Sequence, residues 1–332
     1  MNPTITYSPA YTLVPTYECF NRCSYCNFRV DPEGDEWLTL PEAETILRDL
    51  RDTGTIEILI LSGEVHPQSP RRREWCDRIY DLCDLALTLG FLPHTNAGPL
   101  SFAEMARLKA VNVSIGLMVE QVTPSLLQTV HKRAPSKVPA MRLQQLEQAG
   151  ELRIPFTTGL LLGLGETRAD WRESLEAIAR LQSQYGHVQE VILQPHSPGT
   201  RQIYDAAALQ PEDLLNAIAL AREILPSAIA IQIPPNLVPD ANFLLACLEA
   251  GARDLGGLSP KDEVNPDYDH PTPEFLASII EPRGWKLEPR LPVYPQYYDW
   301  LSTRLQGAIR DLMSRSPSFN PSIKSVNLAK FL

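Results

Sequence analysis

The amino-acid sequence predicts an α/β fold, and within that class a (β/α)8 barrel of the TIM type. Short apolar runs alternate with amphipathic helical patterns along most of the chain. The apolar runs are continuous, as in Ile58-Leu59-Ile60-Leu61, which is typical of a parallel sheet covered by helices. Eight strand–helix units suit the about 250 residues usual for this barrel. A doubly wound open sheet is the alternative, and the sequence alone separates the two poorly.

The expected elements follow one another in regular order. We expect strands at residues 12–18, 57–62, 92–96, 112–117, 155–162, 188–194, 229–233 and 254–258. We expect helices at residues 40–52, 73–89, 102–109, 137–149, 169–184, 211–224, 242–250 and 273–280. Thr39 and Ser101 are expected N-caps, because Glu42 and Glu104 follow them at the spacing of a capping box.

The region after the last expected barrel helix is predicted to extend the same domain. The barrel takes residues 1–283, and residues 284–332 are expected to pack on it as a C-terminal extension with a helix at 296–314. No low-complexity linker and no fixed-period repeat divides the chain. The sequence therefore predicts a single domain with a helical extension.

The composition indicates which classes of partner are not expected and in which compartment the protein is expected. The 332 residues include 40 Asp and Glu against 30 Lys and Arg, a net charge of −10. Nucleic acids and anionic membranes attract a surplus of basic residues, so neither is expected as a partner. No signal peptide opens the sequence and no run of about 18 apolar residues occurs, so we expect a cytoplasmic protein. Cysteines in that compartment more often bind metal or catalyse than form disulfides.

Three of the six cysteines lie close together, at Cys19, Cys23 and Cys26, after the first expected strand. A [4Fe-4S] cluster usually takes one thiolate per iron, so three cysteines leave one iron open to a substrate or cofactor. One alternative is a zinc site that borrows a distant fourth ligand. The other is a redox pair formed by Cys23 and Cys26. We predict the cluster, with these three cysteines as its ligands.

With Tyr25 before the third cysteine, the motif resembles that of the radical S-adenosylmethionine (SAM) superfamily. Two further segments agree in order and position. Ser62-Gly63-Glu64 resembles the GGE element of that superfamily, and the segment 159–166, GLLLGLGE, resembles its G-x-I-x-G-x-x-E element. The resemblance implies that the amine and carboxylate of SAM bind the open iron. It also implies that one electron from the cluster cleaves SAM to a 5′-deoxyadenosyl radical.

The resemblance further implies which residues bind SAM. Glu64 receives the methionine ammonium, a role that suits a carboxylate because the contact is charge-assisted. The strand around Leu161 backs the adenine, and Tyr25 packs near it. Glu120 binds the ribose, and Ser114 lines the pocket. The complete set implied in this way is Tyr25, Ser62, Gly63, Glu64, Ser114, Glu120, Gly159, Leu161 and Gly163.

Longer stretches resemble one branch of the superfamily, the family of FO synthase subunit one, where FO is 7,8-didemethyl-8-hydroxy-5-deazariboflavin. The stretches are Cys23-Ser24-Tyr25-Cys26-Asn27-Phe28-Arg29, Pro93-His94-Thr95-Asn96-Ala97-Gly98 and Ser114-Ile115-Gly116-Leu117-Met118-Val119-Glu120. The resemblance implies a substrate in which a hydroxybenzyl fragment of tyrosine is joined to a ribityl-aminouracil. Hydrogen abstraction, ring closure and ammonia release then give FO. Subunit two, which makes the adduct, and a reductant such as ferredoxin or flavodoxin are the implied partners.

Three residues are candidates for acid–base catalysis in such a reaction. His94 lies towards the end of the third expected strand, Glu190 lies in the sixth, and His196 follows the sixth. The carboxyl ends of the strands form the mouth of a barrel, where active sites of this fold lie. We therefore expect the three side chains to serve the leaving amine and the polar groups of the substrate.

Three other functions compete with this one. The chain could be subunit two, which uses tyrosine, or a futalosine cyclase of the menaquinone pathway, both within the same superfamily. From a different class, it could be a non-catalytic iron–sulfur or zinc protein, but neither role needs Glu64 or the 159–166 segment. The remaining cysteines occur in apolar helical patterns and are expected in the core. They are Cys76, Cys83 and Cys247.

Overall fold

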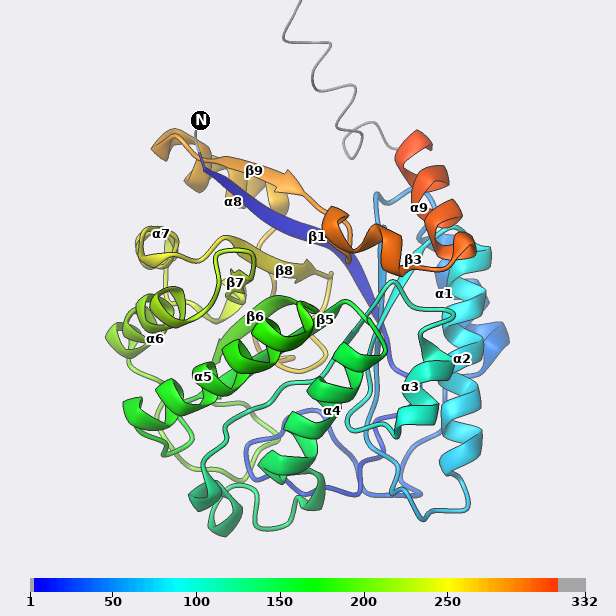
Figure 1. The fold of residues 1–332 in the computed structure, drawn as a ribbon, viewed down its shortest axis with the longest axis horizontal. Coiled ribbons are helices and arrows are strands. Elements are labelled where there is room, and N and C mark those ends of the chain that lie inside the picture. Colours follow the sequence, from blue (N-terminus) through cyan, green and yellow to red (C-terminus); the bar gives the residue numbers. More distant parts are fainter. Residues whose placement is uncertain (1–2, 316–332) are drawn as a thin grey trace, which may run out of the picture.

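The barrel strands are all parallel and close on themselves in the computed structural model, which describes residues 3–315 (Figure 1). The strand that closes the barrel is β1, which pairs with β8 through residues 6–9 and with β2 through residues 10–13. The strands are β1 (Thr4–Leu13), β2 (Glu57–Leu61), β3 (Leu92–Asn96), β4 (Ser114–Gly116), β5 (Phe156–Leu162), β6 (Val188–Pro195), β7 (Ala230–Gln232) and β8 (Asp254–Leu258). The predicted barrel is confirmed, and the open sheet is excluded.

Helices surround the barrel on its outside (Figure 1). The α-helices are α1 (Leu40–Asp49), α2 (Arg72–Thr88), α3 (Phe102–Leu108), α4 (Pro139–Glu151), α5 (Arg168–Tyr185), α6 (Pro211–Ile224), α7 (Ala241–Ala250), α8 (Pro273–Ile280) and α9 (Thr303–Arg315). The short 3-10 helices are η1 (Pro124–Gln128), η2 (Pro135–Lys137), η3 (Pro235–Leu237), η4 (Glu281–Arg283) and η5 (Pro295–Trp300). Thr39 and Ser101 form the predicted capping boxes at α1 and α3.

The first strand lies earlier than the sequence predicted. The expected strand at 12–18 is wrong, because β1 spans Thr4–Leu13 and the chain leaves the barrel before Pro15. Pro9 is an unfavourable residue inside a strand, since proline cannot donate a ladder hydrogen bond. The barrel accommodates Pro9 beside a register irregularity between Thr6 and Ser8. The cysteine motif is consequently separated from β1 by an extended segment.

That extended segment still supports the sheet. The amide of Gly63 donates to the carbonyl of Thr16 (2.8 Å), and the amide of Phe20 donates to the carbonyl of Glu64 (3.0 Å). Residues 16–20 therefore lie against the loop that follows β2. The predicted strand at 12–18 thus overlaps β1 only at residues 12–13, and the rest of it forms the extended segment that follows β1.

The C-terminal extension begins with a ninth strand that the sequence did not predict. This strand, β9 (Lys286–Pro289), pairs in parallel with residues 4–7 of β1, and the two lie side by side in Figure 1. The expected helix at 296–314 is divided into η5 and α9 by an extended residue, Leu301, with ψ of 152°. Ser302 then accepts a hydrogen bond from the amide of Leu305 (3.4 Å). Residues 316–332 lie outside the described residues.

Alternate residues of the strands face opposite sides of the barrel wall. Ile58 and Ile60 of β2 are fully buried against the helices, whereas Leu59 and Leu61 face the barrel interior. The three cysteines outside the motif are buried in the core as predicted: Cys76, Cys83 and Cys247. Across residues 3–315, no helix combines the length and apolar character that a membrane span requires.

Candidate active site

The cysteine loop follows β1 and is held by backbone hydrogen bonds from several parts of the chain. The amide of Cys19 donates to the carbonyl of Val30 (3.1 Å), and that of Ser24 donates to the carbonyl of Val130 (3.1 Å). The motif thus has a defined path although it belongs to no helix or strand. Its three thiols are unpaired and partly exposed.

The protein environment favours the neutral thiols. Burial, together with the charge of Glu64, raises the pKa of Cys19 to about 11. Burial also raises the pKa of Cys23 to about 12, and Lys137 only partly opposes this. Binding of iron would replace these protons, because a coordinating thiol is deprotonated.

The donor set fits a cluster better than a single ion. Within residues 3–315, no three His, Cys, Asp or Glu side chains are arranged around one metal ion. A cubane cluster with one open iron instead requires three thiolates that each bind a separate iron. Cys19, Cys23 and Cys26 lie on one loop and are the residues that could supply these thiolates, and Asn21 Nδ2 adds a polar contact to the Cys19 sulfur at 3.7 Å.

A cavity of about 310 Å³, here called the upper chamber, lies beside Tyr25 and Cys26. Its size falls at the lower end of the range for small-molecule sites, about 300–1,000 Å³. Apolar side chains on its wall include Phe28, Leu61, Leu117, Leu161 and Ile192. Polar and charged ones include Ser62, Glu64, Glu120, Lys137, Arg142, Gln194 and His196.

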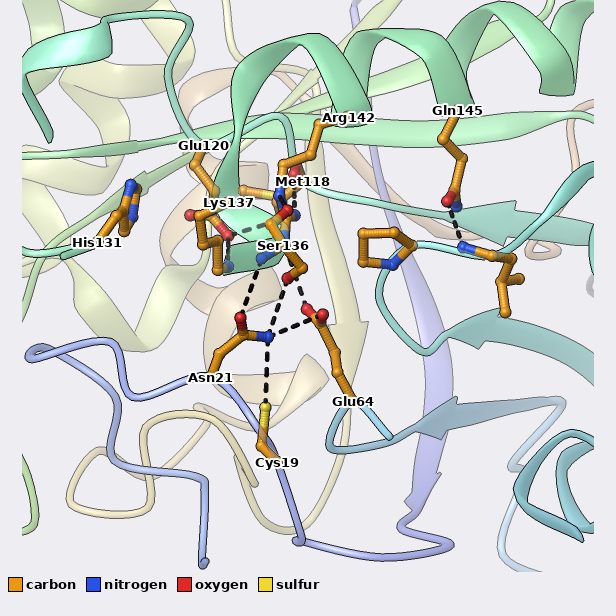
Figure 2. Close-up of polar contacts among 12 residues, drawn as sticks. Cys19, Asn21, Glu64, Met118, Glu120, His131, Ser136, Lys137, Arg142 and Gln145 are labelled. Atoms are coloured by element: carbon orange, nitrogen blue, oxygen red, sulfur yellow. Dashed lines mark hydrogen bonds and ion pairs between the residues drawn. The ribbon is translucent and has the colours of Figure 1, made fainter. Parts of the chain in front are cut away.

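Charges of both signs meet in the upper chamber, as Figure 2 shows. Asn21 Nδ2 donates to Glu64 Oε2 (2.9 Å), and Arg142 Nη2 donates to Glu64 Oε1 (3.3 Å). Lys137 Nζ donates to Glu120 Oε1, and Arg142 Nη1 lies 3.8 Å from the same oxygen. Two carboxylates and two cations thus face a chamber that could hold an amino acid zwitterion.

Electrostatics fix the ionisation of this group. Burial alone would raise the pKa of Glu120, but Lys137 and Arg142 outweigh it and the pKa falls below its usual range. Burial and Lys137 together lower the pKa of His131 to about 4, so the ring is neutral near pH 7. The Tyr25 hydroxyl lies 3.1 Å from His131 Nε2, which holds the tyrosine ring at the chamber wall.

Backbone geometry positions two of the carboxylates. Glu120 has a φ of 66°, a backbone conformation that residues other than glycine seldom adopt. Where such residues occur, they cluster at functional sites. Its amide donates to the Gly159 carbonyl (3.1 Å), which ties it to β5. Glu64 lies against Gly98, where a Cβ atom would come 2.3 Å from Glu64 Cγ. The glycine therefore leaves the space that the carboxylate occupies.

A second cavity of about 170 Å³, here called the lower chamber, lies deeper inside the barrel. Leu59, Leu61, Asn96, Met118, Ile192 and Val264 line both chambers, so the two adjoin. Polar groups predominate further from the shared wall. They include Glu57, His94, Thr157, Glu190, Gln232 and Arg290. Because Glu57 begins β2 and Glu190 lies early in β6, the lower chamber reaches the amino ends of the strands.

The sequence-predicted residues are distributed between the chambers. Tyr25, Ser62, Glu64, Glu120, Leu161 and His196 line the upper chamber, and His94 and Glu190 line the lower one. His94 lies mid-strand and not at the barrel mouth, where we had expected it. The structure therefore brings His94 and Glu190 into one cavity and separates them from His196.

The other predicted residues do not line either chamber. Ser114 lies behind His94, with its Oγ 2.6 Å from His94 Nδ1 and donating to the Pro292 carbonyl (2.6 Å). It orients the histidine and is not exposed to the upper chamber. Three glycines instead allow close approach of backbones or a left-handed turn: Gly63, Gly159 and Gly163.

Several residues of the site were missed by sequence reasoning: Asn21, His131, Ser136, Lys137, Arg142 and Arg290. Arg142 left a usable signal. It shares one face of α4 with Leu146, Ala149 and Gly150, and a buried charge on an apolar helix face needs a partner. Lys137 was assigned to a helix beginning there, whereas α4 begins at Pro139 and Lys137 ends η2.

Known proteins match this chain in sequence and in fold. Residues 13–178 match the Radical SAM superfamily. The 7,8-didemethyl-8-hydroxy-5-deazariboflavin synthase of Trichormus variabilis is 67% identical over 305 residues, which are 92% of this chain and 90% of the relative. The synthase of the same name from Synechococcus elongatus is 60% identical over 321 residues, 97% and 95% of the two chains.

Solved structures share the fold at low identity. The FeFe-hydrogenase maturase HydG from Carboxydothermus hydrogenoformans has a TM-score of 0.74 and 18% identity, with 98% of this chain and 82% of that chain covered. Methylornithine synthase (PylB) has a TM-score of 0.65 and 16% identity, with 86% and 83% covered. These two likenesses concern the barrel alone. The sequence matches carry the assignment: the chain belongs to the radical SAM superfamily and, within it, to the family of the 7,8-didemethyl-8-hydroxy-5-deazariboflavin synthases.

Proposed function

We propose that this chain forms FO from the hydroxybenzyl–ribityluracil adduct, as FO synthase subunit one. The observation that carries the proposal is the pair of adjoining chambers, in a chain 67% identical to a 7,8-didemethyl-8-hydroxy-5-deazariboflavin synthase. The upper chamber adjoins the cysteine loop and holds charges of both signs, and the lower chamber includes Glu190, His94 and Arg290 in its lining. A [4Fe-4S] cluster with SAM, when bound, supplies the carbon radical that removes a hydrogen atom from the substrate.

In this proposal Cys19, Cys23 and Cys26 hold the cluster, and the upper chamber holds SAM. Glu64 receives the ammonium group, because its carboxylate is oriented by hydrogen bonds from Asn21 and Arg142. Lys137 and Arg142 are the nearby cations that suit the SAM carboxylate. The two ends of the amino acid thus find groups of opposite charge in one chamber.

Three more contacts complete the proposed SAM site. The adenine lies against the apolar wall at Leu161, beside Tyr25, and the ribose lies near Glu120. Gly159 and Gly163 shape the backbone around that wall without adding side chains. Ser62 lines the chamber next to Glu64. His196 also lines it, and we propose that His196 contacts the substrate where the two chambers adjoin.

The adduct occupies the lower chamber in part and extends into the adjoining upper chamber, because about 170 Å³ is too small for the whole molecule. Release of ammonia needs a proton on the leaving nitrogen, and Glu190 can supply it because burial raises the pKa of its carboxyl to about 7. Burial lowers the pKa of His94 to about 3, so this ring is neutral and serves as a hydrogen-bonding group for uracil or ribityl atoms. The barrel wall around the chamber also limits the access of water to a reactive carbon radical.

The proposal assigns partners as well as chemistry. Subunit two supplies the adduct, and a reductant of the ferredoxin or flavodoxin kind supplies the electron. Tyr25-Cys26-Asn27-Phe28-Arg29 favours subunit one over its tyrosine-using sister. We place the reaction in the cytoplasm, where thiols and iron–sulfur clusters stay reduced.

A coupled assay tests this function. The reconstituted protein is combined under anaerobic conditions with a subunit-two enzyme, tyrosine, the ribityl-aminouracil, SAM and a reductant. Deazaflavin fluorescence should appear only when both proteins are present, and Cys23→Ala should abolish it together with the iron–thiolate absorbance. Deazaflavin from the partner alone, or none from the pair, would contradict the proposal.

A further inference from the structure

Residues 290–294, here called the strap, cross the amino ends of the barrel strands directly after β9. The Arg290 amide donates to the Tyr7 carbonyl of β1 (2.7 Å). The Pro292 carbonyl accepts from Ser114 Oγ of β4 (2.6 Å) and from Gln189 Nε2 of β6 (3.1 Å). The strap is thus tied to three strands, and Arg290 and Pro292 line the lower chamber.

The Arg290 side chain links two acidic residues of the barrel floor. Its Nε donates to Asp254 Oδ2 (2.6 Å), and its Nη2 donates to Asp254 Oδ1 (2.8 Å), which makes a bidentate pair with β8. Nη2 also forms an ion pair with Glu190 Oε1 of β6. Thr157 Oγ1 donates to the other Glu190 oxygen (2.9 Å). Glu190, Asp254 and Thr157 are buried, and the Arg290 side chain is 10% exposed.

The floor carries more negative than positive groups. Three carboxyls, of Glu57, Glu190 and Asp254, lie around one guanidinium. His94 adds no charge, because burial lowers its pKa to about 3. The charged and titratable groups that act on Glu190 are Arg290, Asp254, Glu57, Tyr294 and Tyr297. Arg290 is therefore the one cation among the described groups that compensates the Glu190 carboxylate.

We propose that Arg290 is a positioning residue for FO formation: it holds Glu190 against the lower chamber and balances its charge, so that the C-terminal extension is part of the active site. This inference rests on the proposed function. It accounts for the polar strap contacts at the closed end of the barrel, which a purely structural plug of apolar residues would not need.

The charge pattern predicts opposite effects for two substitutions. Burial and the neighbouring carboxyls raise the pKa of Glu190, and Arg290 opposes them. Arg290→Gln removes the opposing charge, so the pKa rises further. Asp254→Asn removes one of the raising charges, so the pKa falls. If Glu190 is the acid, FO formation declines as pH rises through this pKa, and the decline moves to higher pH in Arg290→Gln and to lower pH in Asp254→Asn.

The experiment compares reconstituted full-length variants over a range of pH, with the adduct as substrate. In Arg290→Gln, we expect the alkaline limb of the pH profile of FO formation, where the rate declines, to lie about one pH unit or more higher than in the wild type. It should stay near the wild-type position in Arg290→Lys and in Arg304→Gln, an exposed ion-pair arginine of the same extension. Formation of 5′-deoxyadenosine without substrate should be unchanged in Arg304→Gln, because Arg304 lines neither chamber.

A second readout does not depend on activity. Infrared titration of the metal-free protein follows the protonated carboxyl band that Glu190→Gln removes, and this band should persist to higher pH in Arg290→Gln. Should Arg290→Gln fail to fold, the downward shift in Asp254→Asn and the retained profile in Arg290→Lys carry the same test.

The outcomes separate the two claims. No FO from the wild-type protein would overturn the proposed function and this inference with it. FO from the wild type, with limbs that do not move in Arg290→Gln or Asp254→Asn, would overturn the inference alone.

Discussion

At the scale of single residues, Arg142 connects the two acidic groups of the upper chamber. Its guanidinium donates to the Ser136 carbonyl (3.1 Å) and the Met118 carbonyl (2.6 Å), and it contacts both Glu64 and Glu120. The side chain is 2% exposed. Removal of one partner of such a buried group leaves an uncompensated charge, which typically costs about 3–5 kcal/mol. The orientation of each carboxylate therefore depends on the other charges of the chamber.

Glu64→Gln should weaken SAM binding. The amide keeps an oxygen for Asn21 but loses the negative charge, and a charged hydrogen bond is worth about 1.5–3 kcal/mol, or roughly a 10- to 100-fold change in Kd. Calorimetric titration of the reconstituted protein with SAM measures it. Glu44→Gln, which removes an exposed ion pair with Arg48, is the matched control and should bind SAM as the wild type does. Equal affinity in both variants would remove Glu64 from the proposed site.

His94→Asn should alter how stability depends on pH. The pKa of His94 is about 3 in the folded protein because of burial and Arg290, and about 6.5 in the unfolded chain. The unfolded state therefore takes up the proton first, and stability falls as pH drops from 6.5 towards 3, by up to about 1.4 kcal/mol per pH unit.

The variant should lose this part of the slope, measured by denaturant unfolding of the metal-free protein between about pH 5 and 7. His66→Asn, at an exposed position, should keep the wild-type slope. Identical slopes for His94→Asn and the wild type would show that the ring titrates normally.

At the scale of elements, most of the barrel follows from local pattern. The strands β3 and β8 and the helices α6 and α8 have the predicted bounds, because continuous apolar runs and helical periodicity are local signals. The upper chamber was predictable in part, since Ser62-Gly63-Glu64 directly follows β2 and the 159–166 segment forms the carboxyl end of β5 and the turn after it. The strand β1 was displaced because Pro9 lies inside it, and a pairing partner that tolerates proline cannot be read from the sequence.

The lower chamber was much less predictable. Arg290 lies in an irregular segment with no periodicity, and it reaches Glu190 and Asp254 only because β9 pairs with β1. Such contacts join residues far apart in the chain. A single sequence carries no local pattern that indicates such contacts. The ninth strand and the residues at the floor of the barrel could therefore be identified only in the structure.

Gly63→Ala tests how the extended segment after β1 is fitted to the loop after β2. A Cβ atom at Gly63 would lie 2.1 Å from the carbonyl oxygen of Glu18, which is backbone and cannot rotate away. We expect a loss of about 1–3 kcal/mol in unfolding free energy and reduced iron incorporation. In α9, a Cβ atom added at Gly307 would meet one atom within 4 Å beyond its own helix backbone, Arg310 Nη2 at 3.9 Å. Gly307→Ala should therefore be neutral or stabilising. Equal stability of the two variants would contradict the close approach.

At the scale of the whole molecule, the barrel separates two tasks along its axis. The upper chamber lies among the loops at the carboxyl ends of the strands, beside the cysteine motif. The lower chamber lies within the barrel, and the strap closes it at the amino ends. The C-terminal extension therefore contributes to the fold through β9 and α9, and to the floor of the cavity through Arg290 (Figure 1).

The most direct test of the central claim supplies the adduct without the enzyme that makes it. The adduct is prepared with a subunit-two enzyme, separated from that enzyme and from tyrosine, and given to this protein with SAM and a reductant. We expect FO together with 5′-deoxyadenosine from this protein alone, and neither FO nor extra SAM cleavage when tyrosine replaces the adduct. Stimulation of SAM cleavage by tyrosine, or no FO from the adduct, would contradict it.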